Sequence, residues 1–248
     1  MATFRMVVAY DGAPFHGFAR QPEVDTVQGS VEAAMQKVLG TAITTSAAGR
    51  TDAGVHALGQ VMSFNTDVEV DPDNLMVRLN SMCGPAIAIL STEAAPVGFD
   101  ARFSAVARTY EYGLFTRTTP DPFARHTTWH FPHPIDREAM GKAAASLLGE
   151  HAWDSFGRVE EGKNPVRRVE SIDIEHDGDL TTIRITANSF IQQMVRSIVG
   201  TLVQVGTGKI HPDEMDRILH ARDRAQAGPV APPHGLFLVS VEYPEELV

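Results

Sequence analysis

Hydrophobic and polar positions along the chain follow two repeating patterns. Alternation of apolar and polar residues is typical of strands with one buried face. Apolar residues spaced by three and four positions predict amphipathic helices. The sequence predicts strands over residues 4–10, 41–46, 58–64, 86–92, 108–116, 166–176, 180–187 and 235–243. It predicts helices over residues 26–39, 71–81, 136–148, 188–205 and 212–220.

Capping and turn residues support several of these boundaries. Thr26 can cap the first helix, which Gly40 would end. Asp71 followed by Pro72 is a typical helix start, since proline is favoured at the first helical position. The sequence Asp177-Gly178-Asp179 between two apolar segments predicts a β-hairpin.

The order of predicted elements indicates the fold class. Strand, helix, strand, strand, helix, strand is the order of a ferredoxin-like unit, and the chain contains it twice. We therefore predict an α+β protein with two ferredoxin-like halves, residues 1–104 and 105–248. Side by side they would form one extended, mixed but mainly antiparallel sheet with a central cleft. The final strand is expected in the second half.

Composition places the chain among ordinary globular proteins. Its 248 residues are 43% hydrophobic and 21% charged. A lone cysteine, Cys83, excludes a disulfide framework and a cysteine metal cluster. The N-terminus lacks the pattern of a signal peptide, and no apolar stretch approaches the roughly 18 residues that span a membrane. We expect a cytoplasmic protein.

The charge of the chain leaves two interpretations open. A net charge of −10 by itself argues against a nucleic-acid partner, because Lys and Arg supply affinity for phosphate. Cations nevertheless occur in or beside the segments that carry candidate chemistry, and could form a basic surface on an acidic protein. The alternative is that they are scattered over a solvated surface. These cations are Arg20, Arg50, Arg102, Arg108, Lys163, Arg167, Arg168 and Arg196.

The candidate catalytic segment lies between the strands expected at 41–46 and 58–64. It reads Gly49-Arg50-Thr51-Asp52-Ala53-Gly54-Val55-His56-Ala57. No second acidic residue stands within ten residues of Asp52, which excludes a local pair of carboxylates. A single carboxylate beside a cation suits a nucleophilic or orienting role. An ordinary turn is the alternative, because Asp and Gly are favoured in turns for conformational reasons.

This segment resembles the signature of the tRNA pseudouridine synthase A family, in which the aspartate is the catalytic nucleophile. Three later segments resemble other motifs of that family: 102–112, 190–200 and 233–239. The loop at 11–21 is similar to a further motif, although Phe18 and Ala19 stand where the family has Trp and Gln. The resemblance spans residues 3 to about 244.

The resemblance implies a fold, an activity and a set of site residues. The fold would be that of pseudouridine synthases, and the activity the isomerisation of uridines 38, 39 and 40 in the tRNA anticodon stem-loop. No cofactor or metal would be needed, and a homodimer would bind the tRNA. Asp52 would be the nucleophile, with Arg50, Arg196 and Tyr110 as further catalytic residues. Substrate contacts would come from Tyr110, Leu236, Arg20, Arg50, Arg102 and Arg108.

Other functions are weighed against this one. A non-catalytic RNA-binding protein could keep the same fold, and a small-molecule enzyme could use the groove between the halves. His126, His130 and His133 are spaced like metal ligands, but Pro132 and Pro134 argue against a helix there. We therefore expect no metal site.

Overall fold

The computed structural model describes residues 1–160 and 162–247. The chain divides into two compact units: unit 1 is Met1–Arg108 with Phe237–Val248, and unit 2 is Thr109–Leu236. We predicted a boundary at 104/105 with the final strand in the second half. The last strand instead groups with unit 1, so the N-terminal unit is completed by the C-terminal end of the chain.

Unit 1 has the strand order of a ferredoxin-like fold. Its hydrogen-bonded neighbours run β4-β1-β3, and β2 pairs with the C-terminal part of β3. These pairings are antiparallel, whereas β10 pairs with the start of β3 in parallel. The elements are β1 (Ala2–Tyr10), α1 (Val27–Leu39), β2 (Thr45–Ala47), β3 (His56–Thr66), α2 (Pro72–Cys83), β4 (Ile87–Ala95) and β10 (Leu236–Glu242).

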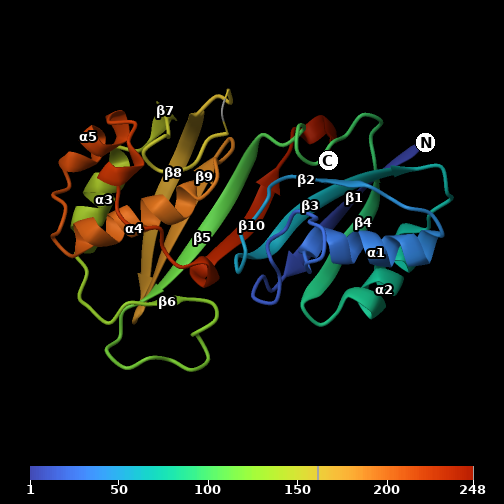
Figure 1. Ribbon diagram of the computed structural model, residues 1–248, viewed down its shortest axis with the longest axis horizontal. Helices are drawn as coiled ribbons and strands as arrows, with labels where there is room; N and C mark the ends of the chain where they lie inside the picture. The colour runs from blue at the N-terminus through green and yellow to red at the C-terminus, as the bar shows by residue number, and fades with distance from the viewer. Residues whose placement is uncertain (161, 248) are drawn as a thin grey trace. The chain divides into compact units, whose positions relative to one another are not determined.

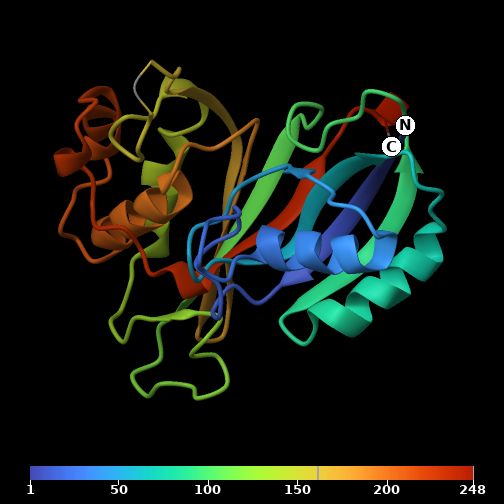
Figure 2. The same cartoon turned by 45° about the vertical axis from the view of Figure 1, so that its right-hand side comes forward.

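Both faces of the unit 1 sheet are covered. Helices α1 and α2 lie against one face (Figure 1 and Figure 2). On the other face a smaller apolar cluster forms around Val61, Phe99 and Ala101, joined by Tyr243 from the end of the chain. Because both faces are covered, all five residues at 60–64 of β3 are buried, whichever face of the sheet their side chains point to.

The predicted helix caps of unit 1 are confirmed. The Thr26 side chain accepts a hydrogen bond from Gly29 N at 3.2 Å, and Gly40 ends the helix with φ 71°. Asp71 caps α2, whose first residue is Pro72. Strand β2 is shorter than predicted, because only Thr45–Ala47 pairs with β3.

Unit 2 contains the strand neighbours β5-β9-β8-β7, with the short β6 parallel to β5. The β8–β9 pair is antiparallel and closes at the predicted hairpin, where Gly178 has φ 56°. Helix α3 packs against α4 and α5. The elements are β5 (Ala107–Phe115), β6 (Trp129–His130), α3 (Arg137–Ala145), β7 (Gly149–Ala152), β8 (Val166–Asp177), β9 (Leu180–Ala187), α4 (Met194–Gly206) and α5 (Glu214–His220).

Two helix predictions in unit 2 were wrong at one end. The helix predicted from residue 188 begins at Met194, because Gln193 takes the left-handed conformation with φ 64°. Ile191 belongs instead to a segment that packs on Gly157, while Gln192 O accepts from Arg158 N at 3.0 Å. Helix α3 ends at Ala145, and the residues after it form β7 along the edge of β8.

The predicted α+β class with mainly antiparallel pairing is confirmed within each unit. Across residues 1–160 and 162–247, no helix has the length and apolar character needed to cross a membrane.

Candidate active site

Asp52 lies on a tight turn at the start of β3. Val55 N donates to Asp52 O at 3.1 Å, which closes a four-residue turn. Its third residue, Gly54, has φ 76°. This left-handed conformation is strained for residues with a side chain, whereas glycine adopts it readily. The Asp52 side chain is half-buried and Arg50 is exposed. The glycine is thus required by the backbone of the turn that carries the carboxylate.

Buried polar side chains hold this turn from the neighbouring strands. The amide of Gln60, which is fully buried, donates to Gly49 O at 2.8 Å and accepts from Gly49 N at 3.3 Å. The Tyr10 hydroxyl lies 2.8 Å from Thr51 Oγ1. Burial raises the pKa of Tyr10 to about 12, so the phenol stays protonated and available as a donor. Gly49 and Thr51, which precede Asp52, are therefore held by side chains of β1 and β3.

The loop at 11–21 is packed directly against the same turn. Phe18 N donates to Thr51 O at 3.0 Å, and the Phe18 ring is buried 6.0 Å from that of Tyr10. Any Cβ on Gly12 would lie 2.0 Å from Val55 O, so only glycine allows the two backbones to meet. The loop supports the turn through its backbone and Phe18.

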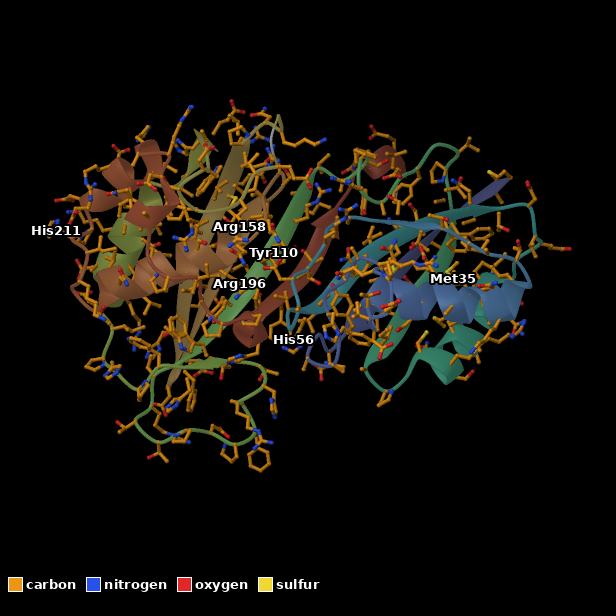
Figure 3. All side chains as sticks on the ribbon, viewed as in Figure 1. Met35, His56, Tyr110, Arg158, Arg196 and His211 are labelled. Carbon is orange, nitrogen blue, oxygen red and sulfur yellow. The ribbon has the colours of Figure 1, made fainter. Side chains whose placement is uncertain are left out.

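His56 links the loop to the start of β3. Gly12 N donates to His56 Nδ1 at 3.1 Å, so the imidazole accepts a bond from the backbone of the loop. The Asp11 carboxylate lies 3.1 Å from the same Nδ1, and the ring stacks on Phe237 at 4.6 Å. Figure 3 shows the position of His56, the first residue of β3, in unit 1. This histidine therefore has a clear structural role in the turn.

Tyr110 lies on β5 in unit 2, where it is 8% exposed and meets Phe190 edge to face at 5.0 Å (Figure 3). Tyr112, two residues along, donates from its hydroxyl to Pro232 O at 2.9 Å. Its ring leaves no room for a side chain at Gly235, where a Cβ would lie 2.7 Å from Tyr112 Cζ. The strand thus holds the segment that leads to Leu236.

Arg196 on α4 holds that same segment from the helix. Its Nε donates to Ala231 O at 2.7 Å, while Ala231 N donates to Arg196 O at 3.0 Å. One turn later, a Cβ on Gly200 would lie 1.8 Å from Pro229 O. Helix α4 and residues 228–232 are therefore in backbone contact, and the half-buried Arg196 side chain is oriented by this contact.

The remaining predicted arginines differ in their surroundings. Arg20 and Arg50 are exposed, and the exposed Arg102 lies over the Phe103 ring at 5.4 Å. Arg108 is buried, and its guanidinium donates to the backbone carbonyls of Ala48, Ala105 and Arg102 at 2.7–3.2 Å. These bonds give Arg108 a structural role in tying the strand before the signature to residues 102–105.

The predicted site residues are divided between the two units. Asp52, Arg20, Arg50, Arg102 and Arg108 belong to unit 1, and Tyr110, Arg196 and Leu236 to unit 2. In the part of the chain that the structure describes, no group of three His, Cys, Asp or Glu side chains is placed to bind a metal. His130 Nε2 lies 2.8 Å from Arg117 O, so it is engaged by the backbone.

Sequence analysis did not identify Gln60 or Tyr10 as supports of the site. Gln60 offered a signal, because it shares the strand face of Met62 and Phe64 and an amide on a buried apolar face needs partners. Tyr10 ended an apolar strand face and gave no separate signal. Their partners on the turn follow only from the folding of the chain.

A family model described as tRNA pseudouridine synthase matches residues 6–104 and 143–244. Similar full-length proteins bear the name tRNA pseudouridine synthase A. One from Agrobacterium fabrum is 41% identical over 99% of this chain and 94% of its own length. One from Rhodopseudomonas palustris is 41% identical over 98% of this chain and 100% of its own length.

The chain therefore belongs to the tRNA pseudouridine synthase family, whose members are isomerases. The family and enzyme class expected from the motif at residues 49–57 are confirmed.

Proposed function

We propose that the protein converts uridine to pseudouridine at positions 38, 39 and 40 of the tRNA anticodon stem-loop, with Asp52 as nucleophile and no cofactor. The observation that carries this proposal is the match of 41% identity over nearly the whole chain to proteins named tRNA pseudouridine synthase A. The support given to the Asp52 turn by Tyr10, Gln60 and the 11–21 loop agrees with a carboxylate that must be aimed.

The reaction is an isomerisation in which all atoms of the uridine are kept except one exchangeable proton. The bond between N1 of uracil and C1′ of ribose breaks, and a bond between C5 and C1′ forms. The C5 proton leaves to solvent, and N1 gains a proton. A stacked base must first be moved out of its stack into the enzyme, as in other enzymes that act on bases. Asp52 supplies the carboxylate that assists breaking of the glycosidic bond.

The other site residues receive roles that match their chemistry. Tyr110 presents an aromatic face for the base, and Leu236 an apolar one. The exposed Arg50 holds the extruded nucleotide. Arg196 supplies the positive charge that acts together with the Asp52 carboxylate.

A dimer would reconcile the charge of the chain with an RNA substrate. At a net charge of −10, a chain repels RNA on average, so binding must use a local cluster of cations. Two chains that share one tRNA would double the number of such contacts. We propose a homodimer, and light scattering after size-exclusion chromatography measures its mass directly.

Release of tritium from uridine C5 tests the nucleophile. Unmodified tRNA labelled at C5 is incubated with wild-type protein, with Asp52→Asn and with the control Asp67→Asn, whose side chain is 75% exposed in unit 1. Wild type and Asp67→Asn should release label at the same rate. Asp52→Asn should be slower by about a thousandfold or more, as expected for loss of a nucleophile.

Other outcomes separate the alternatives. Equal release by wild type and Asp52→Asn would end the assignment of Asp52. No release by either, with salt-dependent tRNA binding retained, would indicate a non-catalytic RNA-binding protein. No release and no binding would favour a small-molecule enzyme. Transcripts that keep a single uridine at 38, 39 or 40 identify which positions react.

A further inference from the structure

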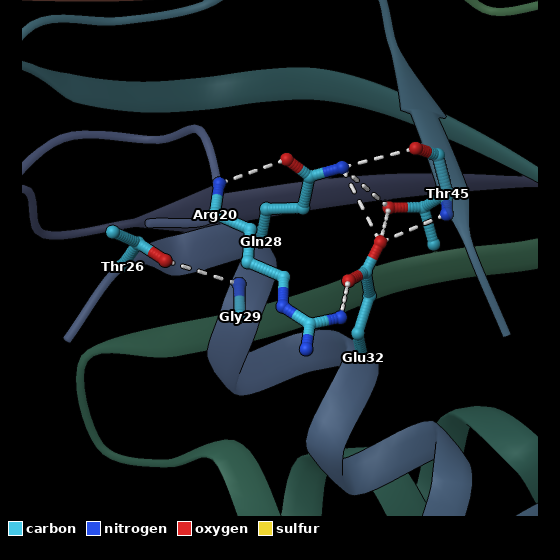
Figure 4. A network of polar contacts seen from close by, with 6 residues as sticks. All are labelled: Arg20, Thr26, Gln28, Gly29, Glu32 and Thr45. Atoms are coloured by element: carbon cyan, nitrogen blue, oxygen red, sulfur yellow. Dashed lines mark hydrogen bonds and ion pairs between the residues drawn. The ribbon is translucent and has the colours of Figure 1, made fainter. Parts of the chain in front are cut away.

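Helix α1 buries a carboxylate close to the loop that supports the Asp52 turn. The Glu32 side chain is only 7% exposed. Its Oε1 accepts from Thr45 N at 2.9 Å, from Thr45 Oγ1 at 3.0 Å and from Gln28 Nε2 at 3.3 Å (Figure 4). A neutral glutamine could accept the same bonds from Thr45. The negative charge, which is costly to bury, therefore needs another explanation.

The charge has a partner in Arg20. Arg20 Nη1 lies 3.4 Å from Glu32 Oε2, the carboxylate oxygen that Thr45 leaves unused (Figure 4). The Arg20 side chain is 72% exposed, so most of its guanidinium remains open to a ligand. Guanidinium groups recognise phosphate through several N–H donors held in a fixed plane. The burial of Glu32 thus anchors one end of an exposed phosphate-binding group.

The main chain of Arg20 is fixed by the same helix. Arg20 N donates to Gln28 Oε1 at 3.0 Å, and Gln28 Nε2 donates in turn to Thr45 O at 3.0 Å (Figure 4). Phe18, two residues before Arg20, bonds to Thr51 beside Asp52. Backbone and side chain of Arg20 are therefore tied to the elements that hold the catalytic turn. Such preorganisation reduces the entropy lost when the side chain binds its ligand.

We infer that Glu32 is a positioning residue for the RNA substrate: its buried carboxylate holds the Arg20 guanidinium where it binds a phosphate of the tRNA backbone. This inference rests on the proposed function in that the substrate is tRNA. It predicts that the loss of a negative charge weakens the binding of tRNA. Removal of a negative charge should by itself improve binding of a polyanion, whereas loss of a positioning carboxylate should weaken it.

A double-mutant cycle tests the inference. KM and kcat for tRNA are measured by tritium release for wild type, Arg20→Gln, Glu32→Gln and the double variant at several salt concentrations. Arg20→Gln should raise KM about fivefold and lower the slope of log KM against log salt by about one. Glu32→Gln should raise KM about threefold with kcat within about twofold of wild type. In the Arg20→Gln background, Glu32→Gln should have no further effect.

Matched controls separate positioning from folding. Glu93→Gln removes the carboxylate paired with Arg5 elsewhere in unit 1, and KM should stay unchanged. Thermal unfolding of each variant shows that it is folded. If Glu32→Gln does not fold, Glu32→Asp, which keeps the charge on a shorter side chain, takes its place in the cycle.

Several results would overturn the inference. KM unchanged or lowered by Glu32→Gln would show that the carboxylate does not position Arg20. An equal rise of KM in the Arg20→Gln background would indicate a structural effect independent of Arg20. No effect of Arg20→Gln would remove the phosphate contact itself. Failure of the proposed function is distinct, since wild type would then release no tritium.

Discussion

Asp52 owes its position to side chains that come from other parts of unit 1. Gln60 bonds to both backbone atoms of Gly49, and Tyr10 bonds to Thr51. The side chains of Gln60, Tyr10 and Thr51 are buried, so their polar groups would be costly to leave without a partner. The turn that carries the carboxylate is therefore held by these polar bonds together with the buried Phe18 ring of the 11–21 loop.

At the residue scale we predict that Gln60→Leu damages both stability and activity. Leucine has a similar volume, but it leaves the partly buried Gly49 N and Gly49 O without their partners. The free energy of unfolding should fall by about 2–4 kcal/mol, and tritium release should fall more steeply than the folded fraction. Urea unfolding and initial rates measure the two effects.

The control for this variant is Gln36→Leu on the exposed side of α1. It makes the same chemical change, and stability should stay within about 0.5 kcal/mol of wild type. Equal losses in the two variants would show that the bonds of Gln60 to Gly49 contribute nothing specific.

At the scale of elements, α4 and residues 228–232 act as one piece. Gly200 lets the backbone of Pro229 approach the helix, and Gly228 N donates to Thr201 Oγ1 at 2.9 Å. Arg196 and Ala231 exchange two further bonds. The contact orients a predicted catalytic arginine and the segment leading to Leu236 together.

We predict that Gly200→Ala separates these two elements. The new methyl group would lie 1.8 Å from Pro229 O, so one backbone must move. Stability should fall by about 3 kcal/mol, the upper end of the cost of overpacking, and activity should fall because Arg196 moves. Thermal unfolding and tritium release measure this.

Gly141→Ala in α3 is the matched helical substitution. Apart from the neighbouring residues and the backbone of the helix itself, no heavy atom lies within 4 Å of the new methyl group there. Stability should rise by about 0.5–1 kcal/mol, because alanine favours the helix more than glycine. If Gly200→Ala behaved in the same way, the close approach to Pro229 would be refuted.

At the scale of the whole molecule, unit 1 is built from both ends of the chain. Strand β10 pairs with β3, Phe237 stacks on His56, and Tyr243 packs on Phe99 at 5.0 Å. The Tyr243 hydroxyl also donates to Ala101 O at 2.8 Å. The C-terminal residues are therefore part of the unit that carries Asp52.

A chain that ends at residue 235 should lose stability in unit 1, because β3 loses its neighbour β10. Both tryptophans, Trp129 and Trp153, lie in unit 2, so their fluorescence follows that unit alone. Amide hydrogen exchange in β1 and β3 follows unit 1 and should accelerate by about tenfold or more. A chain ending at residue 244 keeps β10 and serves as control. Unchanged exchange in β1 and β3 would contradict the assignment of β10 to unit 1.

Local sequence determined most of the elements and the family. The alternation in β1, β5 and β9 and the caps at Thr26, Asp71 and the Asp177–Asp179 turn act between near neighbours, so the pattern alone identifies them. The motif around Asp52 identifies the family for the same reason, since the turn and its carboxylate lie within nine consecutive residues. The apolar spacing at Ile191 misled the prediction, because its burial comes from Gly157.

Only the tertiary structure decided what supports the turn and where the chain's last strand belongs. Gln60 meets Gly49, Arg108 meets Ala48 and β10 meets β3 because strands distant in sequence share one sheet. Every residue except proline offers the same backbone N–H and C=O groups. The sequence therefore does not indicate which of them a buried amide or guanidinium bonds to, and only the fold decides this. The sequence therefore specified the family and the motif around Asp52, and the packing of unit 1 specified the geometry of that turn.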